Sequence, residues 1–193
     1  MNDYAESALS PTLWRTCRVL ANPLRLRLLR ELTLCDEATV TALAARVGVT
    51  TEEASMNLRA LNARGLITAR RKSRWVLYQA IPNPAVRGSG LLLKAVLPLL
   101  KGGAAGRRTI IRLATALTHP RRVALVRLLA VKPSPIEDLR KAARMSRQAW
   151  IRHAKKLRDR GLIATAADGR IVLLRQAEPL GAALVRQACL EDA

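Results

Sequence analysis

The chain has 193 residues, half of them apolar and only 3% aromatic, with no Phe. This composition predicts a globular protein with an aliphatic, mainly helical core and excludes a disordered or fibrous chain. Its 34 Lys and Arg against 14 Asp and Glu give a formal net charge of +20, an excess that attracts polyanions such as nucleic acid. The three cysteines, Cys17, Cys35 and Cys189, are odd in number and widely spaced, which argues against a disulfide framework.

Neither an export signal nor a membrane span is expected. The first ten residues are acidic and lack an apolar segment of signal-peptide length. The longest apolar stretch, at 90–100, is too short to cross a bilayer and contains Lys94 and Pro98. We therefore expect a cytoplasmic protein with no membrane partner.

The sequence contains an internal repeat. Residues 12–32 align with residues 109–129 at an offset of 97, and Pro23 and Arg30 match Pro120 and Arg127. After a one-residue deletion, LNARGLI at 61–67 aligns with LRDRGLI at 157–163. Chance similarity between Leu- and Arg-rich helices is the alternative, but the order of the elements is preserved throughout, which favours a duplicated module.

In the first copy, one helix ends near residue 21 and a second begins at Asn22-Pro23, with Asn22 as its N-cap. A short third helix covers 40–47. Thr50 and Glu53 form a T-x-x-E capping box, so a fourth helix begins there and ends at Gly65. The segment 66–81 alternates apolar and polar residues around a basic tip and predicts a β-hairpin.

The second copy predicts the same elements. His119-Pro120 begins its second helix, Ser146 caps its fourth helix, and Gly161 ends that helix. A hairpin follows, turning at Asp168-Gly169. A helix-turn-helix followed by a two-stranded ribbon is a winged helix, so the predicted fold class is mainly α with small β-hairpin wings, in a tandem winged helix-turn-helix.

Two domains and a linker are predicted: a first winged-helix domain at 10–82, a linker with a short apolar helix at 83–106, and a second winged-helix domain with a C-terminal helix at 107–193. The apolar helix, around 91–100, either covers the first module or forms a dimer seam; we favour packing within the chain and keep a homodimer as the alternative. The glycines of KGGAAGRRT do not have the spacing of a phosphate-binding loop and are interpreted as linker.

The first copy resembles the arsenic-repressor-type (ArsR-like) winged helix-turn-helix transcriptional regulators. The resemblance covers about 13–81 and rests on LANPLRLRLLREL and on LAARVGVTTEEASMNLRALNARGLITARRKSRWVLYQAI; a weaker version covers about 110–175. It implies a homodimeric repressor whose recognition helices enter successive major grooves of double-stranded DNA.

Two departures from that family matter. Its metal-sensing members carry a Cys-x-Cys pair where this chain reads ELTLCDE, so Thr33 replaces one thiolate and only Cys35 remains. With two His in the chain, a zinc cluster is not expected either, and we predict no metal and no cofactor. Cys35 is interpreted as a small buried residue, with a redox sensor as the alternative. The tandem is the second departure, because one chain can act as its own pseudo-dimer.

The candidate DNA-binding residues lie on the fourth helix and on the wing of each copy. In the first copy they are Thr51, Glu52, Ser55, Asn57 and Arg59 on an exposed helix face, and Arg70, Arg71, Lys72 and Arg74 on the wing. In the second copy they are Arg147, Gln148, Arg152, His153, Lys155 and Lys156 on the helix, and Arg170 on the wing. The second module is thus basic in its fourth helix, and the first module is basic in its wing. The alternative is that the basic helix face is only solvated and binds no partner. For His153, the alternative is a surface residue without a role in binding.

We expect a DNA-binding transcriptional regulator, a repressor by the resemblance, with duplex DNA as its partner. An enzyme is not expected, because the sequence has neither a catalytic triad nor a paired acid constellation nor a dinucleotide fingerprint. The alternative is an architectural or adaptor protein that binds nucleic acid without sequence preference. A third possibility is a ligand or redox sensor that uses Cys17 or Cys35. The sequence identifies no effector.

Overall fold

The computed structural model describes residues 12–190; the predicted domain ends at 10–11 and 191–193 lie outside the described residues. The fold is mainly α, with small antiparallel β-hairpins, as the sequence predicts. The chain divides into two compact units. Among the described residues, the first comprises Val19–Ile111 and the second comprises Thr12–Arg18 with the chain from Arg112 onward.

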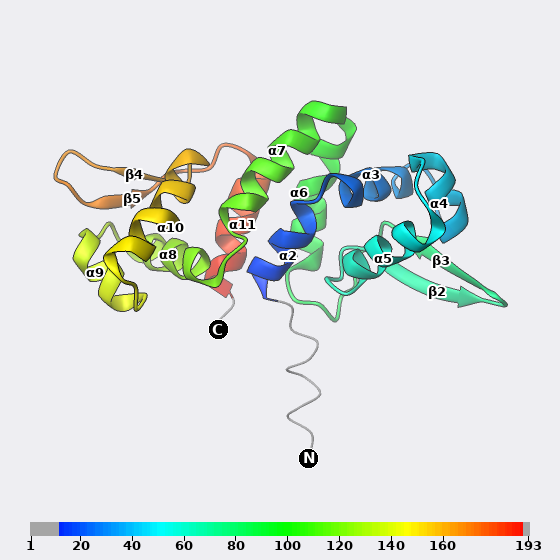
Figure 1. The fold of residues 1–193 in the computed structure, drawn as a ribbon, viewed down its shortest axis with the longest axis horizontal. Coiled ribbons are helices and arrows are strands. Elements are labelled where there is room, and N and C mark those ends of the chain that lie inside the picture. Colours follow the sequence, from blue (N-terminus) through cyan, green and yellow to red (C-terminus); the bar gives the residue numbers. More distant parts are fainter. Residues whose placement is uncertain (1–11, 191–193) are drawn as a thin grey trace, which may run out of the picture. The chain divides into compact units, whose positions relative to one another are not determined.

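The first unit follows the predicted order of elements (Figure 1). Its helices are α3 (Pro23–Leu32), α4 (Val40–Val47), α5 (Thr51–Asn62) and α6 (Ser89–Lys101). Its strands are β1 (Ala38–Thr39), β2 (Thr68–Lys72) and β3 (Trp75–Gln79). Helix α4 packs on α5, and α3 packs on α4, α5 and α6, so α6 covers the first module from within the chain as expected.

The wing of this unit is a three-stranded antiparallel sheet in the order β1-β3-β2. In the hairpin, Thr68 pairs with Gln79 and Lys72 with Trp75, as the alternating pattern predicts. Strand β1 is not predicted from the sequence: Ala38 pairs with Tyr78 just before α4 begins. This third strand fixes the base of the wing next to α4.

The second unit repeats this arrangement (Figure 1). It contains α8 (Pro120–Val131), α9 (Ile136–Ala142), α10 (Arg147–Asp159), β4 (Ile163–Thr165), β5 (Ile171–Leu173) and α11 (Pro179–Leu190). Helix α11 packs on α8, and α10 contacts α8 and β4. Ser134 forms a single antiparallel bridge with Ile171 at the place in the module that β1 occupies in the first unit. Helices α2 (Leu13–Leu20) and α7 (Gly103–Ala116) have residues in both units.

Side-chain caps set the helix starts where the sequence predicts them. The side chains of Asn22, Thr50 and Ser146 accept hydrogen bonds from the backbone N–H of Arg25 (3.0 Å), Glu53 (3.1 Å) and Ala149 (3.2 Å). Such caps stabilise a helix by about 1 kcal/mol each. The predicted inward-facing residues of the fourth helices are all buried: Ala54, Leu58, Leu61, Trp150, Ala154 and Leu157.

The interpretation of 83–106 as a linker around one helix is wrong for its glycine-rich end. Helix α6 ends at Lys101 with Gly102 as its C-cap, and α7 begins at Gly103, whose φ of +62° makes the turn between them. Gly106 is buried, and a Cβ there would lie 1.7 Å from the backbone oxygen of Leu99. The glycines therefore build a tight helix–helix turn, since only Gly permits this approach of the two backbones.

Within residues 12–190, no helix has both the length and the apolar character needed to cross a bilayer.

Candidate nucleic-acid interface

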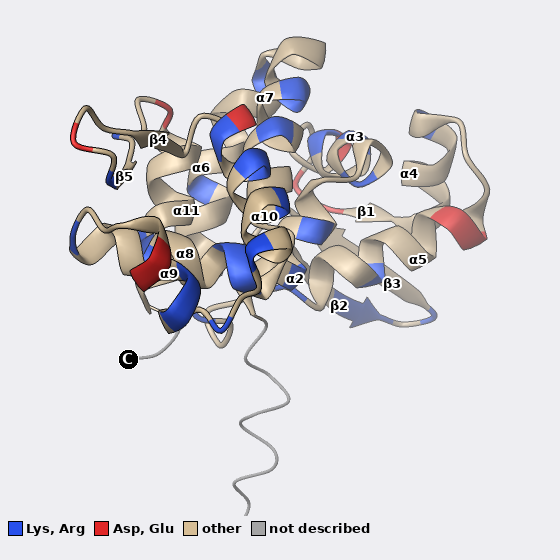
Figure 2. Ribbon diagram, turned by 60° about the vertical axis from the view of Figure 1, so that its left-hand side comes forward, with Lys and Arg blue, Asp and Glu red and all other residues tan. Residues whose placement is uncertain are grey.

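Helix α10 presents a basic face to solvent. Its apolar residues pack inward, while Arg147, Gln148, Arg152 and Lys155 are exposed and Lys156 is half-buried. Figure 2 shows Lys and Arg along α10. Lys155 Nζ lies 3.1 Å from a carboxylate oxygen of Asp159, one helical turn later, with both side chains exposed. An exposed i,i+4 pair of this kind contributes only about 0.3–0.5 kcal/mol, so Lys155 remains available to a stronger anionic partner.

The turn before α10 orients this face. Met145 N–H donates to the carbonyl of Arg140, and Arg144 adopts a φ of +48°, which ends α9 and redirects the chain. Ser146 then caps α10, whose first N–H groups are directed outward from the helix end. A helix N-terminus with a basic exposed face favours phosphate groups, because the backbone dipoles and the side-chain charges have the same sign there.

His153 is not a surface residue, although we predicted it among the DNA contacts. It is only 8% exposed, and its ring contacts that of His119 with centroids 4.4 Å apart and the ring planes tilted by 46°. Burial, together with the charges of Arg122, Arg121 and Arg152, lowers the pKa of His153 to about 4. Its imidazole is therefore neutral near pH 7, and its place is in the contact between α8 and α10 rather than on the basic face.

Helix α5 of the first unit has a different surface. Thr51, Glu52 and Arg59 are exposed as predicted, and Ser55 is half-buried. Glu52 and Glu53 lie in its first turn, where carboxylates stabilise the positive end of the helix dipole. In Figure 2 the start of α5 is accordingly acidic, so this helix end does not favour phosphate.

The predicted exposure of Asn57 is wrong as well. Asn57 is 7% exposed; its Oδ1 accepts a hydrogen bond from Arg25 Nε at 3.0 Å, and its Nδ2 donates to the carbonyl of Glu53 at 2.8 Å. The Asn57 side chain therefore connects α5 to α3 by a hydrogen bond. Asn57 thus lies at the contact between α3 and α5 and not on the exposed face of α5.

The wing of the first unit carries the basic residues that α5 lacks. Arg71, Lys72 and Arg74 are exposed around the turn at Ser73, whose φ is +54°. Arg70 is exposed too, but it forms an ion pair with Glu37. Three of the four predicted wing cations are thus not held by a carboxylate among the described residues.

The second wing is short and electrically balanced. Arg170 lies beside the turn, and its guanidinium contacts the Asp168 carboxylate at 2.6 Å. Hydrogen bonds from the Arg170 side chain and backbone hold the pKa of Asp168 below its ordinary value. Of the fourth helix and the wing, the element with the exposed basic residues is thus the wing in the first unit and α10 in the second.

Sequence reasoning missed three exposed apolar side chains that belong to these surfaces. Trp75 is 49% exposed in the first wing and has the Arg74 guanidinium 5.0 Å from its ring centroid. Met56 on α5 and Ile151 on α10 are also exposed. Helical spacing could have identified Ile151, because it lies one turn from both Arg147 and Lys155. Apolar side chains on such a face can contact thymine methyl groups.

Cys35 is half-buried rather than buried. Its Sγ accepts a hydrogen bond from Arg46 Nη1 at 3.3 Å and donates to the carbonyl of Glu31 at 3.5 Å. Cys17 is buried, and Cys189 is exposed. In the described part of the chain, no three His, Cys, Asp or Glu side chains come together in a group that could hold a metal ion.

Comparison of the chain with protein-family models, with curated proteins and with solved structures gives no match.

Proposed function

We propose that this protein is a DNA-binding transcriptional regulator of the ArsR-like type, a repressor that reads duplex DNA through two winged-helix modules in one chain. The observation that carries the proposal is the exposed face of α10. There Arg147, Arg152 and Lys155 follow a capped helix start in a helix-turn-helix. The charge of +20 and the basic first wing support it.

The two modules contribute differently in this proposal. Helix α10 enters the major groove, where Arg147, Gln148 and Arg152 can pair with base edges. The first wing lies along the phosphate backbone or in the minor groove, because Arg71, Lys72 and Arg74 project from a narrow hairpin. Helix α5 contributes less affinity, since two carboxylates occupy its first turn.

The test is equilibrium binding to duplex DNA at physiological salt. Changing Arg147, Arg152 and Lys155 together to Ala should weaken binding by about 100-fold, if each side chain contributes ~1 kcal/mol. The matched control changes Lys132, Arg175 and Arg186 to Ala; these exposed residues of the same unit lie outside α10, and the change in net charge is identical. An equal loss in both variants would contradict the proposed role of α10.

A second candidate function is architectural binding without sequence preference, and one observation favours it. Four arginines, Arg27, Arg30, Arg46 and Arg107, line a hollow of about 190 Å³ in the first unit, on elements other than α5 and the wing. One carboxylate, that of Glu31, also lines the hollow and lies 3.6 Å from Arg30 Nη1, so the four cations remain in excess. A basic hollow of this kind can hold a phosphate group regardless of base sequence. If this function is correct, Arg27→Ala with Arg46→Ala should weaken binding as much as the α10 variant does.

A further inference from the structure

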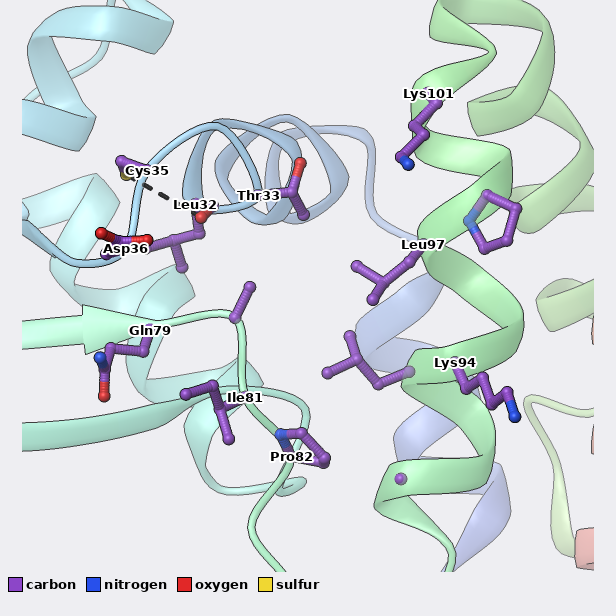
Figure 3. Close-up of a pocket in the computed structure, with 14 residues that line it drawn as sticks. Leu32, Thr33, Cys35, Asp36, Gln79, Ile81, Pro82, Lys94, Leu97 and Lys101 are labelled. Carbon is purple, nitrogen blue, oxygen red and sulfur yellow. Dashed lines mark hydrogen bonds between the residues drawn. The ribbon is translucent and has the colours of Figure 1, made fainter.

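A cavity of about 930 Å³ opens in the first unit, between the C-terminal end of α3, the end of strand β3 and helix α6 (Figure 3). All of its lining residues belong to this unit. Pockets that bind small organic molecules usually have volumes of about 300–1,000 Å³, so the cavity is large enough for such a ligand.

The walls of the cavity are largely aliphatic. Leu32 and Leu93 are almost completely buried behind it, and Leu97 points from α6 into the open space (Figure 3). Ile81 and Pro82 close the side below the end of β3. No aromatic residue is among the lining residues, so the surface suits a flexible aliphatic chain better than a stacked ring.

Three polar residues of the wall, Thr33, Cys35 and Asp36, follow the end of α3, and the first two form hydrogen bonds within their own segment. Thr33 Oγ1 donates to the carbonyl of Arg30 at 2.6 Å, and Cys35 Sγ contacts the carbonyl of Glu31. Asp36 lies on the same side of the cavity, and in Figure 3 Leu32 is placed between the Asp36 carboxylate and Leu97. Gln79 at the end of β3 is a further polar lining residue, whereas α6 contributes the apolar side chains of Leu93 and Leu97 on the opposite side.

Helix α6 supplies the charge at the rim. In Figure 3 the side chain of Lys101 turns along α6 toward the cavity, whereas that of Lys94 carries its ammonium group away from it. Lys101 is exposed, and among residues 12–190 no carboxylate pairs with it. One cation thus stands at the edge of an aliphatic space.

We propose that this cavity binds an aliphatic carboxylate, with its hydrocarbon chain on Leu32, Leu93 and Leu97 and its carboxylate beside Lys101. Burying the chain provides the affinity, at about 0.8 kcal/mol per methylene group removed from water. The ammonium of Lys101 selects the charge of the head group, and the net charge of +20 attracts an anion from solution. This site is independent of DNA binding.

Calorimetric titration with three ten-carbon probes tests the proposal: decanoate, 1-decanol and decyltrimethylammonium, each below its micelle concentration. Decanoate should bind saturably with one molecule per chain and about tenfold more tightly than decanol, and the ammonium probe should bind most weakly. No saturable binding of decanoate, or equal affinity for the three probes, would overturn the proposal.

Two variants with the same change in charge locate the head group. Lys101→Ala should reduce the affinity for decanoate about tenfold, to that of decanol, whereas Lys94→Ala should leave it unchanged within twofold. Leu97→Trp should fill the cavity and abolish binding of all three probes, with circular dichroism to verify folding. If Leu97→Trp does not fold, the two lysine variants still decide the matter: equal losses in both contradict the assigned site. Because no DNA is present, a negative result leaves the proposed regulatory function intact.

Discussion

Arg25 and Asn57 in the first unit occupy the places that Arg122 and His153 occupy in the second. In both units an arginine of the second helix of the module, α3 or α8, lies near a buried polar residue of the fourth helix, α5 or α10. In the first unit the pair is a hydrogen bond of 3.0 Å from Arg25 Nε to Asn57 Oδ1. In the second unit the buried residue is a histidine, held against the N-cap His119. The buried polar residue of the fourth helix therefore has different partners in the two units: an arginine hydrogen bond in the first and a histidine ring in the second.

Replacing Arg25 by Ala tests the first of these contacts. Asn57 Oδ1 would remain buried without this donor, and an unsatisfied buried acceptor costs about 1–3 kcal/mol. Urea unfolding of Arg25→Ala should therefore show a free energy of unfolding lower by about 1–2 kcal/mol. Arg59→Ala, an exposed change on α5, is the control and should stay within ~0.5 kcal/mol of the parent. If the two variants are equally stable, Arg25 does not support α5.

The two histidines predict a specific dependence of stability on pH. Burial is the first cause that lowers the pKa of both His119 and His153, the latter from 6.5 to about 4. Histidines of the unfolded chain therefore take up protons before those of the folded chain. The free energy of unfolding should be highest above pH 6.5 and fall as the pH decreases toward 4.

His153→Asn isolates this effect, because Asn is the residue at the corresponding position of the first unit. Between pH 7 and pH 4.5 its urea midpoint should decline less than that of the parent chain, with the remaining decline due to carboxylates and His119. Parallel curves for parent and variant would show that His153 does not contribute to the pH dependence.

Among the secondary-structure elements, two features are not predicted from the local sequence. They are the tight turn between α6 and α7 and the third strand of the first wing, β1. Glycine-rich KGGAAGRRT has the composition of a linker, because glycine disfavours helix by about 1 kcal/mol relative to alanine. The structure nevertheless begins α7 at Gly103, since the contact of Gly106 with the Leu99 backbone requires a residue without a Cβ. The caps and the inward-facing residues of the fourth helices depend on short spacings, and the prediction of these features is confirmed.

Gly106→Ala tests the tight turn. The added Cβ would meet the Leu99 oxygen at 1.7 Å, so the two helices must separate, and we expect a loss of at least ~2 kcal/mol of stability. The control is Gly90→Ala in α6, where the nearest atom would be 3.8 Å away. That variant should be neutral or gain about 0.5–1 kcal/mol from helix propensity. A flexible linker would instead tolerate both changes equally, as measured by thermal unfolding.

The first wing gives a prediction about salt. Changing Arg71, Lys72 and Arg74 to Ala should reduce the slope of log affinity against log salt by about 2–3, since each phosphate contact contributes about 0.9. The loss should be similar for every DNA sequence. Arg170→Ala in the second wing, where Asp168 already neutralises the cation, should leave the slope nearly unchanged. A large effect of Arg170→Ala, or a sequence-dependent loss in the first wing, would refute this division of roles.

At the scale of the whole molecule, the repeat, the order of elements and the mainly helical fold could be predicted from periodicity and capping residues. The burial of Asn57 and His153 could not, because it depends on partners 32 and 34 residues away, Arg25 and His119. The cavity of about 930 Å³ likewise lies among α3, β3 and α6, whose residues are far apart in the sequence. Spacing identifies the face of a helix, but only the packed neighbours decide which polar residue at its edge is buried.

The proposed DNA-binding elements differ between the two units, because the first unit has a basic wing and the second a basic fourth helix. A chain that reads one half-site with a basic α10 and another with a basic wing should prefer two unlike half-sites. A symmetric palindrome would require equivalent reading elements.

Selection of duplexes from a random pool at physiological salt, with RNA as competitor, tests the central proposal most directly. We expect an enriched, non-palindromic DNA motif, part of which loses its base preference in the variant with Arg147, Arg152 and Lys155 changed to Ala. Uniform recovery of all duplexes, preferential recovery of RNA, or a motif unaffected by that variant would contradict it.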